Sequence, residues 1–170
     1  MENCSSCQKS KATLTCGICS SHVCKSCVQF TDEDQFSFLT KIPTELQTST
    51  FCETCYSQKV VDAIENYKDM MEKARQVNVF EKSQIKETRF LKRKEKPVKV
   101  LSCADRDEAI LRLAFRAVEL GFDTIIDMVM DSKKVSSAKY HTTVWNGSAI
   151  PVNLDPRRLV KDRSIWHNPN

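Results

Sequence analysis

Apolar residues recur at helical spacing between Gln58 and Val77, a stretch without proline or glycine. Their intervals of 4, 3, 4 and 3 residues predict one amphipathic helix. The apolar stripe consists of Val60, Ile64, Tyr67, Met71 and Ala74. Two heptads are fewer than a coiled coil needs, so we expect the stripe to lie on a flanking domain. A homodimer seam through residues 60–74 is the alternative.

A second helix is predicted from Asp105, which supplies a capping carboxylate, with Glu108 three residues further on. Gly121 provides a left-handed stop. One apolar face runs along this helix. It consists of Ala109, Ile110, Leu113, Ala114, Ala117 and Leu120.

Short β-prone runs surround the second helix, and Asn146-Gly147 between the last two predicts a turn. The runs are Val98–Leu101, Thr124–Met130, Tyr140–Trp145 and Ala149–Val152. Along the second run we expect Ile126, Met128 and Met130 to face inward and the acidic residues to face solvent. The order strand, helix, strand, strand predicts an α+β domain with a small antiparallel-rich sheet and one main helix.

The helix ending in ELGFDTIID and the later strand ending in WNGSAIPV are distantly similar to small bacterial β-α-β-β families of poorly defined function. This resemblance implies a fold only, because a fold by itself says little about chemistry.

The 170 residues suffice for one ordinary domain or two small ones, and nine cysteines favour two small units. No apolar stretch approaches the roughly 20 residues of a membrane span, and the first 25 residues lack a signal peptide's apolar core. We therefore expect a reducing, cytoplasmic location, where regularly spaced cysteines bind metal more often than they form disulfides.

Eight of the cysteines form four Cys-x-x-Cys pairs, separated by 8, 4 and 24 residues. Two such pairs complete a closed tetrahedral site, so the array predicts two structural zinc ions. The link of four residues between the second and third pairs is short, and spacing alone leaves open which pairs share an ion.

The order of the pairs, above all the link in CGICSSHVCKSC, resembles the FYVE-type and FYVE-related zinc fingers. The resemblance covers about residues 1–60 and implies a small two-zinc treble-clef (FYVE-like) module. It also implies that the first and third pairs hold one ion and the second and fourth hold the other. The ligand sets are then Cys4, Cys7, Cys24 and Cys27 for one zinc, and Cys16, Cys19, Cys52 and Cys55 for the second.

Lipid-binding members of that family grip phosphatidylinositol 3-phosphate through a basic stretch at the third pair. Here Ser20 and Ser21 stand in that stretch, and only His22 and Lys25 remain as phosphate contacts. A neutral serine pair cannot supply bidentate guanidinium bonding. We therefore do not expect a lipid partner, and phosphoinositide membrane docking ranks as a second alternative function, after nucleic-acid binding.

The formal net charge is +4, but eight thiolates and two zinc ions bring it to about zero. Positive charge concentrates in the basic segment 82–99, which we expect to be a solvated strand or loop. The alternative is nucleic-acid or ribosome-associated binding. Its contacts would be Lys92, Arg93, Lys94, Lys96 and Lys99.

No residue constellation predicts an enzyme: neither Cys103 nor the carboxylates near His141 form a convincing acid, base or nucleophile set. The insert between Cys27 and Cys52 carries many apolar residues, which either cap the zinc core or present a docking patch. We predict a zinc-binding, non-enzymatic intracellular adaptor with a protein partner. Its expected parts are a zinc-finger module at 1–58, a connecting helix at 59–78, an α+β domain at 79–155 and a tail at 156–170.

Overall fold

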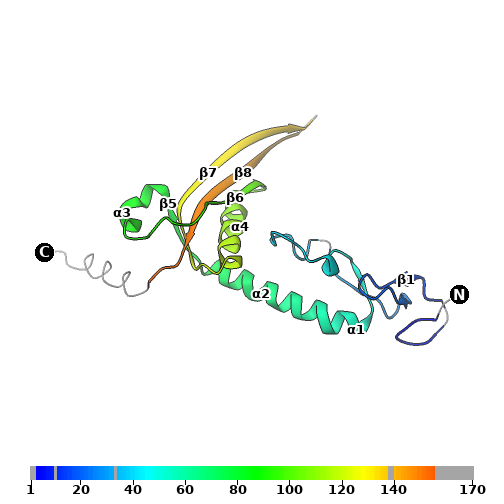
Figure 1. Ribbon diagram of the computed structural model, residues 1–170. Helices are drawn as coiled ribbons and strands as arrows, with labels where there is room; N and C mark the ends of the chain where they lie inside the picture. Colours follow the sequence, from blue (N-terminus) through cyan, green and yellow to red (C-terminus); the bar gives the residue numbers. More distant parts are fainter. Residues whose placement is uncertain (1–2, 10, 33, 138–139, 156–170) are drawn as a thin grey trace. The chain divides into compact units, whose positions relative to one another are not determined.

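The computed structural model describes residues 3–9, 11–32, 34–137 and 140–155 (Figure 1). The chain divides into two compact units, Met1–Asp69 and Met70–Asn170. The predicted tail at 156–170 lies outside the described residues.

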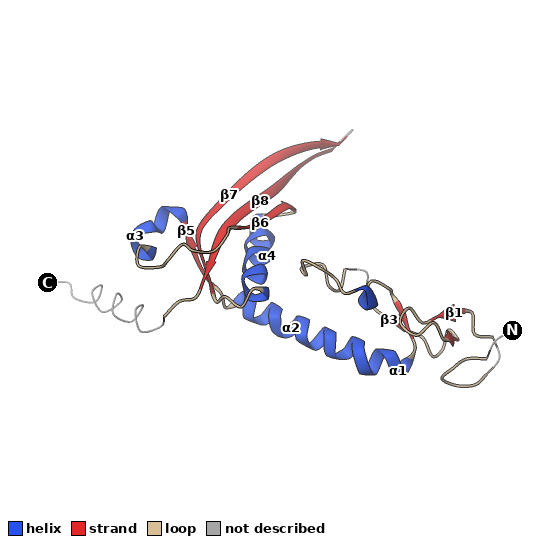
Figure 2. Ribbon diagram, in the orientation of Figure 1, coloured by secondary structure: helices blue, strands red, loops and turns tan. Residues whose placement is uncertain are grey.

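The amino-terminal unit contains little regular structure ahead of its helical run (Figure 2). Strand β1 (Leu14–Thr15) pairs antiparallel with β2 (His22–Val23), and β3 (Gln29–Phe30) pairs antiparallel with β4 (Thr50–Phe51). One 3-10 turn, η1 (Thr44–Leu46), lies between β3 and β4. Strands of two residues are too short to be stable by themselves, so another interaction must hold this unit together.

The predicted connecting helix is present and begins earlier than expected. The Cys52 Sγ caps α1 (Glu53–Cys55) by accepting a hydrogen bond from the Cys55 N–H. The helical run continues through a π-helical turn, η2 (Tyr56–Val60), into α2 (Val61–Arg75). A sulfur cap lacks the sequence signature of an Asp, Asn, Ser or Thr cap, which explains the missed start.

The apolar stripe of this helix is buried or partly buried within the chain. Val60 and Ala74 are buried, and the other three members are partly buried. The Phe36 ring meets the Tyr67 ring edge-on, with centroids 5.5 Å apart and an interplanar angle of 85°. Such an edge-to-face pair attaches the insert to the helix.

The apolar core of this unit is small and rich in sulfur. One buried cluster joins three cysteines, Cys4, Cys16 and Cys52, to Val23. A core of this size cannot offset the conformational entropy of 60 residues. The cysteines must therefore contribute more than apolar burial.

The carboxy-terminal unit is built on a four-stranded sheet with the order β5-β7-β8-β6. Its strands are β5 (Asn78–Glu81), β6 (Val98–Cys103), β7 (Thr124–Ser137) and β8 (Tyr140–Val152). β7 pairs antiparallel with β8, and β8 with β6, whereas β5 runs parallel to β7. With helix α4 (Arg106–Glu119) between β6 and β7, the predicted α+β order is confirmed and β5 is added.

Both faces of this sheet are covered. Helix α4 buries Ala109, Leu113 and Ala117 against Ile125 and Met128 on one face. The opposite face carries a second cluster around Leu91, Ile126, Val152 and Leu154. Leu91 follows two short helices, η3 (Lys82–Gln84) and α3 (Ile85–Thr88), in the segment that we expected to be solvated throughout. That expectation is wrong for Thr88 and Leu91, which are both buried.

A β-bulge in β7 reverses the faces predicted from simple alternation. Ile125 and Ile126 are both fully buried, but they belong to the clusters on opposite faces. The register shifts between Ile126 and Val129, and Asp127 takes a left-handed conformation with φ of 51°. An extra residue changes the side on which later residues lie, so Ile126 does not share a face with Met128 as predicted.

The turn predicted at Asn146-Gly147 is wrong, because β8 passes through both residues without a break. Gly147 is buried and lies close to α4 and its neighbouring strands. A Cβ added there would lie 2.9 Å from Leu113 Cδ1 and 2.8 Å from Met130 Sδ. The glycine is therefore needed for close approach in the core and not for a turn.

Replacing this glycine tests the packing. We expect Gly147→Ala to lower the free energy of unfolding of the carboxy-terminal unit by about 1–2 kcal/mol, because Leu113 and Met130 must move aside. Urea denaturation followed by tryptophan fluorescence measures this, since Trp145 lies on the same strand as Gly147. Ser148→Ala on the same strand is the control, and equal stability of both variants would contradict the packing account.

Helix α4 has the predicted cap and stop. The Asp105 side chain accepts a hydrogen bond from the Glu108 N–H at 2.7 Å. Gly121 has φ of 83°, as expected of a left-handed stop. Leu120 was expected on the buried face but is 59% exposed, because the helix ends at Glu119 and Leu120 is its cap residue.

The Glu108 carboxylate makes this cap sensitive to pH. Its pKa is lowered by hydrogen bonds from the Arg112 side chain at 2.8 Å and the Ala104 N–H at 2.7 Å. A lowered pKa in the folded state means that the stabilisation is present above the ordinary carboxyl pKa and is lost as pH falls through the lowered value. We expect Glu108→Gln to cost about 1 kcal/mol at neutral pH and less at pH about 3. Urea denaturation at both pH values checks this, and an equal cost at both would contradict it.

Candidate metal centres

The described residues bring eight cysteines together in two groups of four. One group is Cys4, Cys7, Cys24 and Cys27, and the other is Cys16, Cys19, Cys52 and Cys55. Within each group the sulfur atoms lie within 4.8 Å of one another. The first pair thus joins the third and the second joins the fourth, which is the pairing implied by the resemblance.

Backbone hydrogen bonds explain why the first pair meets the third. The Ser5 N–H donates to the His22 carbonyl at 2.9 Å, which holds the first Cys-x-x-Cys turn against β2. β2 leads directly into the third pair, and the Cys24 N–H lies 3.4 Å from the Cys4 Sγ. Strand β2 therefore brings the first and third cysteine pairs close together.

A corresponding bond joins the second pair to the fourth. The Gly17 N–H, inside the second turn, donates to the Thr50 carbonyl of β4 at 2.9 Å. β4 leads directly to Cys52 at the start of the helical run. A Cβ on Gly17 would lie 2.1 Å from Thr48 Oγ1, so only glycine allows this approach.

The sulfur spacing fits tetrahedral coordination. The Sγ atoms of Cys7 and Cys24 are 3.8 Å apart, and so are those of Cys19 and Cys52. A tetrahedron with metal–sulfur bonds of about 2.3 Å has edges of about 3.8 Å. Each group can therefore hold one metal ion. Four protein sulfurs complete a tetrahedron and leave no position for a substrate or a reactive water.

The electrostatics of the first group favour a cation. Backbone N–H groups of Cys7 and Cys24 lower the pKa of Cys4 to about 6, so this sulfur is readily a thiolate. The neighbouring thiols of Cys24 and Cys7 instead raise the pKa of Cys27 to about 12. Four negative sulfurs repel one another at this distance, and a bound cation removes the conflict.

In the second group, too, one thiol has a lowered pKa and another has a raised pKa. Hydrogen bonding to the Ser21 hydroxyl and backbone lowers the pKa of Cys19 to about 6. Burial, followed by the neighbouring thiol of Cys52, raises the pKa of Cys55 to about 12. In both groups, therefore, the full set of thiolates that a metal needs forms only together with the metal.

The ninth cysteine belongs to neither group. Cys103 is buried at the end of β6, in the cluster beneath α4. Burial raises the pKa of its thiol above the ordinary value, which disfavours the reactive thiolate.

The other predicted contact residues are all exposed. His22 on β2 and Lys25 between two ligands are both exposed. The four lysines predicted as nucleic-acid contacts are also exposed, namely Lys92, Lys94, Lys96 and Lys99.

Arg93 differs from these lysines. Its Nε and Nη2 atoms form a bidentate pair with the Asp127 carboxylate at 2.5 and 3.0 Å. Its Nη1 atom also donates to the carbonyls of Thr88 and Leu91 at 3.3 and 3.1 Å. Sequence reasoning placed Arg93 among the nucleic-acid contacts and missed this pair, because no local pattern connects residues 34 positions apart.

Comparison with known proteins identifies no relative. No protein-family model matches the chain, and neither a curated protein nor a solved structure matches it. No helix in the described part of the chain is long and apolar enough to cross a bilayer.

Proposed function

We propose that this chain is a zinc-binding, non-enzymatic adaptor that acts through protein–protein interaction. The observation that carries the proposal is the amino-terminal unit, in which ligands of two closed four-sulfur groups flank an insert whose pocket has an apolar side and a polar side. A closed metal site supplies no open coordination position for catalysis. The insert offers surface for recognition.

Zinc is the proposed metal, and a FYVE-related treble clef is the proposed fold of the module. Tetrahedral four-sulfur groups suit zinc, and a reducing compartment such as the cytoplasm keeps the thiols available. Support for the treble clef comes from the hairpin at the second pair and from the fourth pair at the beginning of a helix.

A pull-down from lysate with the tagged full chain tests the adaptor role. Protein that stays bound at high salt and is lost with Cys24→Ser would support it. Nucleic acid that elutes between about 50 and 200 mM salt, from variant and wild type alike, would move the function to the exposed lysines at 92–99. Binding to vesicles containing phosphatidylinositol 3-phosphate, but not to plain vesicles, would move it to His22 and Lys25.

A further inference from the structure

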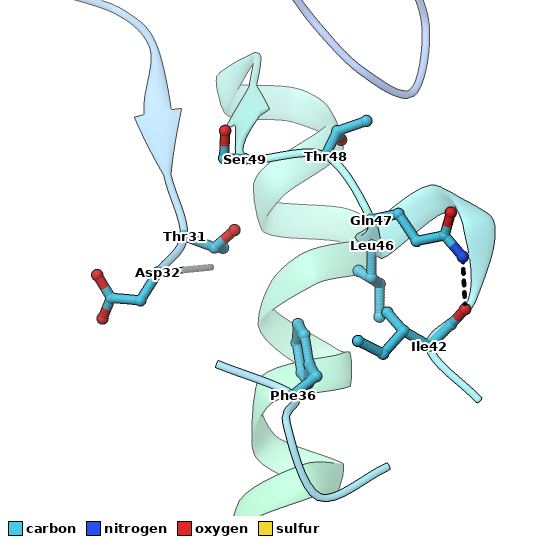
Figure 3. A pocket seen from close by; sticks show the side chains of 8 residues that line it. All are labelled: Thr31, Asp32, Phe36, Ile42, Leu46, Gln47, Thr48 and Ser49. Carbon is cyan, nitrogen blue, oxygen red and sulfur yellow. Dashed lines mark hydrogen bonds between the residues drawn. The ribbon is translucent and has the colours of Figure 1, made fainter. Parts of the chain in front are cut away.

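The insert between the third and fourth cysteine pairs forms a partly open pocket of about 320 Å³ (Figure 3). Eight residues line it: Thr31, Asp32, Phe36, Ile42, Leu46, Gln47, Thr48 and Ser49. This volume lies at the lower end of the range for ligand pockets and suits one or two side chains of a peptide better than a large cofactor.

The pocket has a fixed apolar side. The side chains of Phe36, Ile42 and Leu46 point toward one another in Figure 3. Phe36 is 4% exposed and held by its edge-on contact with Tyr67. The Gln47 Nε2 donates to the Ile42 carbonyl at 3.1 Å, which closes the loop around η1. An apolar ligand would therefore meet a surface that is already formed.

The opposite side of the pocket is polar. Thr31 and Ser49 are joined by a backbone hydrogen bond of 3.2 Å, and both residues line this side. Hydroxyls next to an apolar wall can bind the main-chain amides of a peptide while its side chain is buried.

The insert carries a negative charge, which favours a positively charged partner. Residues 28–50 contain four acidic side chains and one basic one, Lys41. Glu45 is paired with Lys59 at 3.0 Å. Asp32 lines the pocket, and both Asp32 and Asp34, two residues further along the chain, are exposed. A cationic partner is attracted to such a rim, and an anionic one is repelled.

We propose that this pocket binds a peptide segment of a partner protein in which an apolar side chain is flanked by lysine or arginine. The apolar side chain enters between Phe36, Ile42 and Leu46, and the cationic residues lie along Asp32 and Asp34. This inference rests on the proposed adaptor function and specifies the chemistry of its partner.

A displayed library of random nine-residue peptides, selected on the zinc-loaded full chain, tests the inference. We expect enriched peptides to combine a Leu, Ile, Met or Phe with adjacent Lys or Arg. An enriched peptide is then synthesised with a fluorescent label, and its Kd is measured by anisotropy. Enrichment of acidic peptides, of peptides without an apolar residue, or of none would overturn the proposal.

Variants locate the binding. Ile42→Glu places a charge on the apolar wall and is expected to weaken binding by about tenfold or more. Asp32→Lys combined with Asp34→Lys should also weaken it by about tenfold. Glu65→Lys combined with Asp69→Lys, on the exposed side of α2, changes the net charge equally and should leave Kd within about twofold.

Two further readouts separate the pocket from the adaptor role. Each variant is checked for two bound zinc ions, and Ile42→Ser replaces Ile42→Glu if the latter loses metal. Peptides whose binding requires zinc but is unchanged by the Ile42 variants would overturn the pocket and leave the adaptor function standing. Failure of the adaptor function itself shows separately, as the absence of any zinc-dependent partner in the pull-down.

Discussion

Removal of metal from the full chain is expected to unfold the amino-terminal unit and to leave the carboxy-terminal unit folded. Metal ligation supplies roughly 10–16 kcal/mol in comparable zinc peptides, which exceeds what so small a core can contribute. The buried cluster among the described residues of this unit contains three of the candidate metal ligands, Cys4, Cys16 and Cys52, and one other buried residue, Val23. The carboxy-terminal unit has its own apolar clusters on both faces of its sheet.

Hydrogen exchange read separately for the two units measures this result. With a chelator, amides of β1 to β4 should lose protection, whereas amides of α4 and β7 should keep it. Cys24→Ser should give the same loss in the amino-terminal unit and fewer than two bound zinc ions per chain. Cys103→Ser is the matched control and should retain both ions, because Cys103 lies outside the two groups. Two zinc ions in the Cys24→Ser protein would contradict the ligand assignment.

The metal groups show which part of a site can be predicted from sequence. Cys-x-x-Cys is a local signal, so the eight ligands were found from spacing alone. Which two Cys-x-x-Cys pairs share one ion is not determined by local sequence. Only the resemblance to FYVE-related fingers implies it. In the structure it depends on two long-range hydrogen bonds, Ser5 to His22 and Gly17 to Thr50. Their backbone groups have no sequence signature.

In the carboxy-terminal unit, too, local features could be predicted from sequence and long-range ones could not. Helix α4 was predicted well because Asp105, Glu108 and Gly121 act within one or two turns of it. The strands were predicted in their order but not in detail. Gly147 serves packing against Leu113 in place of a turn, and the bulge at Asp127 cannot be seen in the alternation of residues. Both features depend on residues far away in sequence, which propensity and pattern do not include.

A second large loss of stability is expected when the ion pair between the basic segment and the bulge of β7 is removed. Arg93 is expected to attach the segment at 82–97 to β7 through Asp127, which is 16% exposed at its side chain. The carboxylate raises the pKa of Arg93 above its ordinary value, so the guanidinium stays charged. A bidentate guanidinium–carboxylate pair is among the stronger protein hydrogen-bonding arrangements, and lysine cannot reproduce it.

We expect Arg93→Ala to lower the free energy of unfolding of the carboxy-terminal unit by about 3 kcal/mol, because Asp127 is left as a half-buried charge without its cation. The carbonyls of Thr88 and Leu91 lose a donor as well. Lys92→Ala, at the exposed neighbouring position, should change stability by no more than about 0.5 kcal/mol. Urea denaturation followed by tryptophan fluorescence measures both variants.

A double-mutant cycle with Asp127→Asn isolates the pair, since asparagine tolerates the left-handed backbone at this position. We expect a coupling energy of about 1–3 kcal/mol between the two positions. If Arg93→Ala were no more harmful than Lys92→Ala, the segment would be held by Leu91 and its apolar neighbours instead. In that case Arg93 would return to the set of cations available to a polyanionic partner. The cycle therefore decides whether all five predicted contacts at 92–99 are available to such a partner, as the sequence suggests, or only the four lysines.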